Sequence, residues 1–229
     1  LAALFKEAGV PDGVVNVVTG DGSTGEALVN HEGVDKIAFT GSTDVGRKVM
    51  ANASKTLKRI TLELGGKAPN VVFDDADLDQ AVNAALFANF FNQGQACTAG
   101  SRLFVQASIY DAFMEKFLAR IATLRVGDPT QNTTQIGALV SQEQYDKVAE
   151  YIQVGQQEGA TLAFGGKLLQ AEHKGFFIQP TVFTDVKNTM RIAQEEIFGP
   201  VLSVLRFEDD EDAVRMVNEV SYGLASAVW

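Results

Sequence analysis

Short runs of apolar and β-branched residues alternate along this sequence with longer segments in which apolar residues recur every three or four positions. The short runs predict strands over residues 14–18, 36–40, 59–64, 70–73 and 103–106 and after Pro200. The periodic segments predict helices over residues 1–8, 23–30, 45–54, 77–91, 108–124, 141–157 and 210–220. Because single strands alternate with helices, the pattern predicts an α/β fold with a parallel sheet.

Turn and cap residues agree with this division. Ser23 and Glu26 form a capping-box pair for one predicted helix, and Ser141 and Gln144 cap another. Residues 161–184 are typical of short strands and turns, with glycines at 165, 166 and 175.

Both ends of the chain are apolar. It opens without Met on LAALFKEAGV, typical of the last turns of a helix, and stops at ASAVW, which resembles a strand in progress. Natural termini are usually polar and frayed, so we expect an internal piece of a longer protein, truncated at both ends.

Composition narrows the functional classes. The 229 residues are 46% apolar and 21% charged, as in ordinary globular chains of one large or two modest domains. One cysteine excludes an internal disulfide, and with only His31 and His173 beside it no Cys/His zinc site, or any other metal site, is expected. A net charge of −10 argues against a nucleic-acid partner. No apolar run reaches membrane-spanning length and no signal peptide is visible, so we expect no membrane association and a reducing, cytoplasmic location.

The single cysteine, Cys97, lies in the segment FFNQGQACTAGSR, between Gly94 and Gly100. Small and amide-bearing neighbours leave room for a ligand to approach the backbone and supply N–H groups for an oxyanion. A thiolate exposed on a loop is a strong nucleophile. The alternative is that Cys97 is a small buried core residue, and this segment alone does not decide between the two.

Three other segments have features of ligand or catalytic sites. FTGSTDVG, residues 39–46, is a turn between a strand and a helix, where free N–H groups attract phosphate, although a plain tight turn would look similar. In LELGGKAP, Glu63 ends an apolar strand, where partial burial would make it a general base; the alternative is an exposed strand-end carboxylate. EEIFGP, residues 195–200, offers a carboxylate and a phenyl ring that could clasp a ribose and a flat heterocycle, or simply a helix-to-strand corner.

Together these four segments, in this order, resemble the signatures of the aldehyde dehydrogenase superfamily, in its NAD(P)-dependent hydrolytic branch. The similarity extends over the whole chain, including PDGVVNVVTG, FIQPTVF and YGLASAVW. The resemblance implies the later part of a Rossmann-like coenzyme domain, residues 1–63, followed by an α/β catalytic domain that carries the thiol, residues 64–229. It also implies that the chain covers about half of a usual member, and that the parent is a homodimer or homotetramer.

The resemblance implies two catalytic residues. Cys97 would attack the aldehyde to give a thiohemiacetal and, after hydride transfer to NAD(P)+, a thioester; its backbone N–H would be one oxyanion donor. Glu63 would activate the water that releases a carboxylic acid. The implied coenzyme-binding residues are Gly41, Ser42, Gly46, Leu64, Glu196 and Phe198.

The family's second oxyanion donor, an asparagine, and the residues that read the adenosine ribose precede the supplied sequence. We therefore expect the isolated piece to be inactive, and the sequence does not separate NAD, which we favour, from NADP. A coenzyme-independent cysteine hydrolase or acyl transferase stays an alternative, although neither His31 nor His173 lies in a recognisable catalytic setting. So does a non-catalytic fragment or binding domain. The identity of the aldehyde is left open.

Overall fold

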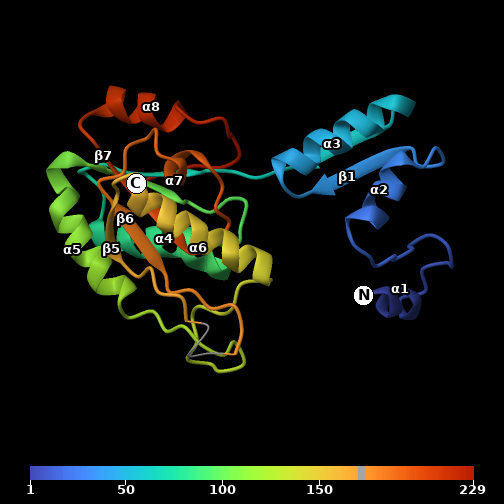
Figure 1. Ribbon diagram of the computed structural model, residues 1–229, viewed down its shortest axis with the longest axis horizontal. Coiled ribbons are helices and arrows are strands. Elements are labelled where there is room, and N and C mark those ends of the chain that lie inside the picture. Colours follow the sequence, from blue (N-terminus) through green and yellow to red (C-terminus); the bar gives the residue numbers. More distant parts are fainter. Residues whose placement is uncertain (170–173) are drawn as a thin grey trace. The chain divides into compact units, whose positions relative to one another are not determined.

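The computed structural model describes residues 1–169 and 174–229, which form two compact units, Leu1–Leu64 and Gly65–Trp229 (Figure 1). The division falls one residue after the boundary expected from the sequence. Strands pair in parallel within each unit, which confirms the predicted α/β class. His173 lies outside the described residues.

The first unit contains a two-stranded parallel sheet. Strand β1 (Lys36–Thr40) pairs with β2 (Arg59–Glu63) in a register that places Thr40 opposite Glu63. The helices of this unit are α1 (Ala2–Glu7), α2 (Gly22–Asn30), α3 (Thr43–Ala53) and the 3-10 turn η1 (Ser54–Thr56). Since the strands are parallel, the segments that leave their carboxyl ends begin side by side.

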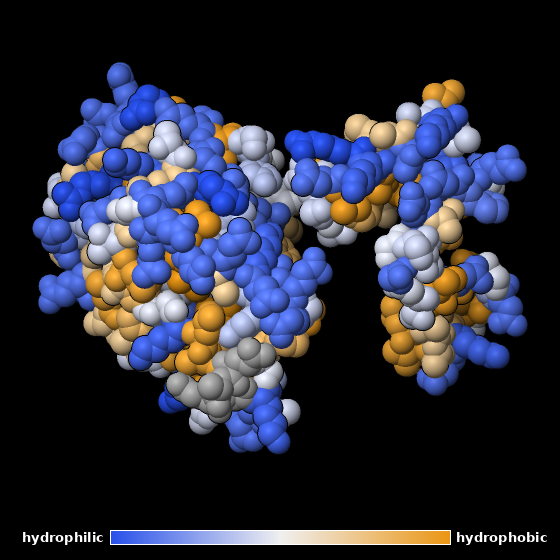
Figure 2. Space-filling view, viewed as in Figure 1, coloured by the Kyte–Doolittle hydropathy of each residue, from blue (hydrophilic) through white to orange (hydrophobic). Residues whose placement is uncertain are grey.

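Two predictions for this unit are wrong. Residues 14–18 form no strand, and their valines are exposed. Figure 2 shows that apolar side chains gather on the surface at the N-terminal part of this unit. A β-branched run becomes a strand only where another strand pairs with it, and no described strand does so here. The N-cap of α2 lies two residues earlier than predicted, because Asp21 rather than Ser23 caps the helix by accepting from the Ser23 N–H at 2.9 Å.

The second unit is organised around a six-stranded sheet with the order β5-β6-β7-β4-β3-β8. All neighbours are parallel except β5 and β6. The strands are β3 (Pro69–Val72), β4 (Arg102–Gln106), β5 (Thr161–Phe164), β6 (Thr181–Thr184), β7 (Val201–Phe207) and β8 (Ala227–Val228). The helices are α4 (Leu78–Phe90), η2 (Phe91–Gly94), η3 (Ala107–Ile109), α5 (Tyr110–Ile121), α6 (Gln142–Gln157), α7 (Arg191–Gln194) and α8 (Asp210–Asn218).

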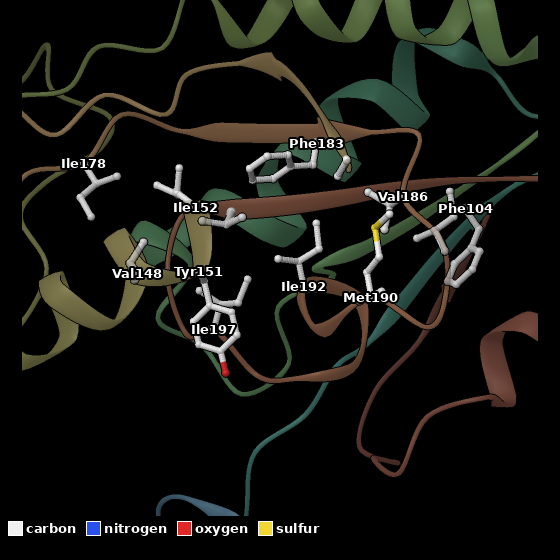
Figure 3. Close-up of a cluster of buried hydrophobic side chains, with 14 of the residues drawn as sticks. Phe104, Val148, Tyr151, Ile152, Ile178, Phe183, Val186, Met190, Ile192 and Ile197 are labelled. Atoms are coloured by element: carbon white, nitrogen blue, oxygen red, sulfur yellow. The ribbon is translucent and has the colours of Figure 1, made fainter. Parts of the chain in front are cut away.

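Alternate residues of these strands face two separate hydrophobic cores. Val71 and Phe104 pack with residues of α6, α7 and α8, in the cluster that Figure 3 shows in part. Val72 and Leu103, one position away on the same strands, pack with residues of α4 and α5. Because both faces are covered, successive apolar residues of the central strands are buried on opposite faces of the sheet.

Candidate active site

In the first unit, the turn after β1 is shaped by close packing. The Gly41 N–H donates to the Glu63 carbonyl at 3.1 Å, and a Cβ at Gly41 would lie 2.4 Å from the Cζ atom of Phe39. The Ser42 hydroxyl caps α3 by accepting from the Val45 N–H at 3.3 Å. The turn therefore leads directly into a helix N-terminus, an arrangement that favours an anionic group such as phosphate.

Gly46 and Leu64 pack against each other behind this turn. Gly46 is buried, and a Cβ there would lie 2.5 Å from the Cδ2 atom of Leu64. Any larger residue at position 46 would push α3 away from the end of β2. The structure thus brings four predicted coenzyme residues of this unit, Gly41, Ser42, Gly46 and Leu64, close to Glu63.

Glu63 itself is exposed at the carboxyl end of β2. The exposure follows from the alternation of the strand: Ile60 and Leu62 are partly covered, while Arg59, Thr61 and Glu63 face outward. Of the two alternatives that the sequence leaves open for Glu63, this exposure agrees, within this unit, with a strand-end carboxylate. Its role as a general base stays a prediction.

In the second unit, Cys97 lies in a turn that follows α4 and η2. Its side chain is partly exposed, which does not fit the alternative of a thiol buried for packing. No described residue accepts a hydrogen bond from its backbone N–H. A nucleophilic sulfur and an N–H donor are thus available on one residue, as an acyl-transfer site requires.

Three loops of this unit approach one another closely at glycine residues. A Cβ at Gly65 would lie 2.0 Å from the Oε2 atom of Glu196, and one at Gly66 would lie 2.5 Å from the carbonyl oxygen of Cys97. A Cβ at Gly94 would lie 2.2 Å from the carbonyl oxygen of Gly199. Residues 65–66, the thiol loop (residues 91–101) and residues 195–200 therefore meet around Cys97. Residues 195–200 are called the nicotinamide loop below, after the role that the family resemblance implies for them.

The Glu196 carboxylate is partly buried at this meeting point. Its Oε1 atom accepts from the Gly66 N–H at 3.4 Å. Burial raises its pKa, and the Gly66 hydrogen bond with the charges of Lys147 and Lys67 opposes that rise. A carboxylate held in this way can accept hydrogen bonds from hydroxyl groups such as those of a ribose.

Lys67 was missed in the sequence reading, although it directly follows the two glycines. Its side chain is 2% exposed, and its amine has no hydrogen-bond partner among the described residues. Burial, followed by the charge of Arg102, lowers the pKa of Lys67 to about 7. Its position in the otherwise apolar run GGKAP was the only sequence signal.

Phe198 has a left-handed backbone conformation, with φ of 57°. For a residue with a side chain this conformation costs about 1–2 kcal/mol, so neighbouring contacts must maintain it. The Gln144 side chain, predicted only as part of a helix cap, supplies two of them. Its Nε2 atom donates to the carbonyl oxygens of Ile197 at 2.9 Å and Phe198 at 2.8 Å.

The start of the nicotinamide loop is also fastened. Glu195 accepts from Arg191 at 2.9 Å and from the Tyr151 hydroxyl at 2.6 Å. The Arg191 hydrogen bond lowers the pKa of Glu195 against the opposing effect of burial. Glu196, the next residue, is thereby held in place.

Two exposed phenyl rings lie where α4 leads into the thiol loop. Phe87 is 67% exposed and Phe91 is 59% exposed, and their ring centroids lie 5.1 Å apart. This pair was not singled out from the sequence.

Within the described residues, no group of three or more His, Cys, Asp and Glu side chains is placed to hold a metal ion. No helix in the described part of the chain is long and apolar enough to cross a membrane.

Comparison with known proteins gives the family. The model of the aldehyde dehydrogenase family matches residues 1–229, the whole chain. The chain belongs to the aldehyde dehydrogenase family. It is 51% identical over 231 residues to betaine aldehyde dehydrogenase of Brucella ovis, a match that covers 100% of this chain and 47% of the relative. The chain therefore spans about half the length of the curated relatives it matches.

Solved structures of family members have the same fold. The aldehyde dehydrogenase KauB from Pseudomonas aeruginosa is 49% identical with a TM-score of 0.98, over 100% of this chain and 47% of that one. The NAD+ complex of aldehyde dehydrogenase from Bacillus cereus is 47% identical with a TM-score of 0.96, over 100% of this chain and 46% of that one. Both matches confirm that the chain has part of the aldehyde dehydrogenase fold.

Proposed function

We propose that the protein containing this chain is an NAD-dependent aldehyde dehydrogenase that oxidises an aldehyde to a carboxylic acid. The observation that carries the proposal is the meeting of three loops around Cys97 in a member of this family. It is supported by relatives named betaine aldehyde dehydrogenase and by solved relatives that are NAD+ complexes.

The first step assigned to Cys97 is addition to the carbonyl. A bond forms between Sγ and the carbonyl carbon, and the carbonyl oxygen becomes an alkoxide that accepts from the Cys97 N–H. Addition must come first because hydride leaves readily only from a tetrahedral alkoxide. When bound, NAD+ supplies the hydride acceptor. The product on the chain is a thioester at Cys97.

Glu63 is assigned the second step. Its carboxylate takes a proton from water as the water oxygen attacks the thioester carbon, and the thiolate of Cys97 then leaves. A base separate from the nucleophile is needed because the sulfur is acylated at that stage. This step gives a free acid, whereas CoA-acylating members of the family, which commonly lack this base, pass the acyl group to a thiol.

The coenzyme residues have features that fit a dinucleotide. Gly41 and Ser42 precede the first turn of α3, where N–H groups suit a pyrophosphate, and Gly46 lets Leu64 pack behind them. In the other unit, Glu196 is assigned the ribose hydroxyls of the nicotinamide half and Phe198 the nicotinamide ring. We favour NAD over NADP because the solved relatives named above include an NAD+ complex.

The proposal also covers the substrate, the oligomeric state and the location of the full-length protein. Betaine aldehyde dehydrogenase relatives support a small aldehyde as substrate. We further propose that the full-length enzyme is a homodimer or homotetramer in the cytoplasm and that it has no nucleic-acid partner.

A coenzyme-independent hydrolase has less support. His31 is exposed, and its Nδ1 atom accepts from the Gly33 N–H at 3.1 Å, a local turn contact rather than a link to a nucleophile. The non-catalytic alternative predicts that Cys97 reacts with alkylating agents no faster than free cysteine at neutral pH.

The test is NADH production by the full-length protein with short aliphatic, aromatic, amino- and carboxy-aldehydes. We expect Cys97→Ala to lose all oxidation, and Glu63→Gln to release a burst of NADH of about one equivalent and then stall. Unchanged steady-state turnover of the Glu63→Gln variant would remove Glu63 from the mechanism. Ester hydrolysis without NAD, and no aldehyde oxidation, would favour the hydrolase.

A further inference from the structure

The first turn of α6 is fastened to both loops that form the site in the second unit. Just before the helix, the Val140 N–H donates to the Gln95 side chain at 3.0 Å, which ties this region to the thiol loop. The Ser141 hydroxyl accepts from the Gln144 N–H at 3.2 Å, which fixes the start of the helix. The amide of Gln144 therefore extends from a helical turn that is itself held in place.

From that turn, Gln144 makes its contacts with the nicotinamide loop. One amide nitrogen donates to two successive carbonyls, those of Ile197 and Phe198. Both N–H bonds of the amide are thus used on backbone groups on either side of the left-handed residue. Since the orientation of the Ile197 and Phe198 carbonyls depends on the backbone dihedral angles there, holding both of them restrains the conformation of Phe198.

The same loop also packs directly against α6. A Cβ at Gly199 would lie 2.3 Å from the Cγ2 atom of Val148, which is one helical turn beyond Gln144. The loop is therefore set by hydrogen bonds at Gln144 and by close packing at Val148. A change at either contact is expected to displace Phe198.

We infer that Gln144 is a positioning residue for the oxidation: its side-chain amide holds the nicotinamide loop so that Phe198 supports the nicotinamide ring. This inference rests on the proposed function and deepens it. The side-chain hydrogen bonds of Gln144 go to the nicotinamide loop and not to Cys97, so its effect should be confined to coenzyme binding and hydride transfer.

The test uses the full-length protein with Gln144→Leu, which keeps the approximate side-chain volume and removes both donors. We expect the KM for NAD+ to rise about tenfold or more, kcat to fall, and the isotope effect with a deuterated aldehyde to increase as hydride transfer becomes limiting. The rate of Cys97 alkylation by iodoacetamide should stay at the wild-type value. Loss of folded protein lowers apparent kcat alone, so the KM separates positioning from a purely structural role.

Three further variants complete the test. Gln153→Leu changes an exposed glutamine on the same helix and should match wild type. Gln144→Met is a second, more flexible replacement without donors, for use if the leucine variant does not fold. Gly199→Ala leaves the Gln144 amide intact but pushes the same loop away from Val148, and it should reproduce the higher KM.

Each outcome decides the inference. An unchanged KM for NAD+ and an unchanged isotope effect in the Gln144 variants would overturn the inference. A raised KM in the Gln144 variants with an unchanged KM in Gly199→Ala would also overturn it, since the amide would then act directly on the coenzyme. If the wild-type protein itself reduces no NAD+ with any aldehyde, the proposed function fails instead. Raised KM in both the Gln144 and Gly199 variants, with normal alkylation, supports positioning by Gln144.

Discussion

Replacing Gly94 by alanine should show how strongly the thiol loop and the nicotinamide loop depend on each other. Gly94 has a φ of 71°, and an added Cβ would lie 2.2 Å from the carbonyl oxygen and 2.5 Å from the carbonyl carbon of Gly199. Alanine in this left-handed conformation costs about 1 kcal/mol relative to glycine. The methyl group also meets backbone atoms, which cannot rotate away as a side chain can, and such overpacking costs about 1–3 kcal/mol. We therefore expect Gly94→Ala to lower the free energy of unfolding by about 2–4 kcal/mol in total.

Gly159 provides the matched control. Its φ of 91° is also left-handed, but nothing lies within 4 Å of the Cβ that alanine would add. Gly159→Ala should therefore show the conformational cost alone, about 1 kcal/mol. The difference between the two variants isolates the contact between the loops.

Urea unfolding followed by tryptophan fluorescence measures both variants. Trp229 is the only tryptophan, and its indole N–H donates to the Asn70 side chain at 2.9 Å, so its emission reports on the second unit. Equal losses of stability in Gly94→Ala and Gly159→Ala would refute the close approach of the two loops. Faster alkylation of Cys97 in Gly94→Ala, with no change in Gly159→Ala, would further locate the perturbation at the thiol.

Two other predictions concern stability. The pKa of Lys67 is lowered to about 7 by burial and by the charge of Arg102. Between about pH 7 and the ordinary lysine pKa, the unfolded chain therefore binds more protons than the folded chain, and the free energy of unfolding rises with pH. Lys67→Met should therefore be more stable than wild type near pH 6, with an advantage that shrinks from about pH 7 to pH 10; an advantage independent of pH in urea titrations would contradict this. Phe117 is a fully buried residue of α5, and Phe117→Ala should lower the free energy of unfolding by about 3–5 kcal/mol. The same change at the exposed Phe87 should lower it by less than about 1 kcal/mol. Similar losses of stability in the two variants would be inconsistent with this packing.

The sequence predicts well those elements that depend on local pattern. Strand β1 has the predicted bounds, α4 agrees to within one residue at each end, and the predicted Ser141 cap of α6 is confirmed by its hydrogen bond to the Gln144 N–H. Each of these depends on residues at most a few positions apart. The assignments of Cys97 and Glu63 also rest on contiguous segments, the family signatures, and they stay predictions.

Predictions failed where a distant partner decides the structure. Residues 14–18 have the composition of a strand, but no described strand lies beside them. The role of the Gln144 side chain was missed for the same reason, because its acceptors are 53 and 54 residues away along the chain. A local pattern carries no information about such contacts.

Backbone conformation at the site is a further property that the sequence concealed. Of the five described non-glycine residues with positive φ, three lie in the thiol and nicotinamide loops, namely Asn92, Gln93 and Phe198. Each costs about 1–2 kcal/mol, so none would persist without contacts that maintain it. The Asn92 side chain donates to the Gln95 carbonyl at 2.9 Å, as the Gln144 amide does to the carbonyls at Phe198. Side-chain amides thus hold strained backbone on both loops. The strain lowers the free energy of unfolding, and in return the thiol and the nicotinamide loop are kept in fixed positions.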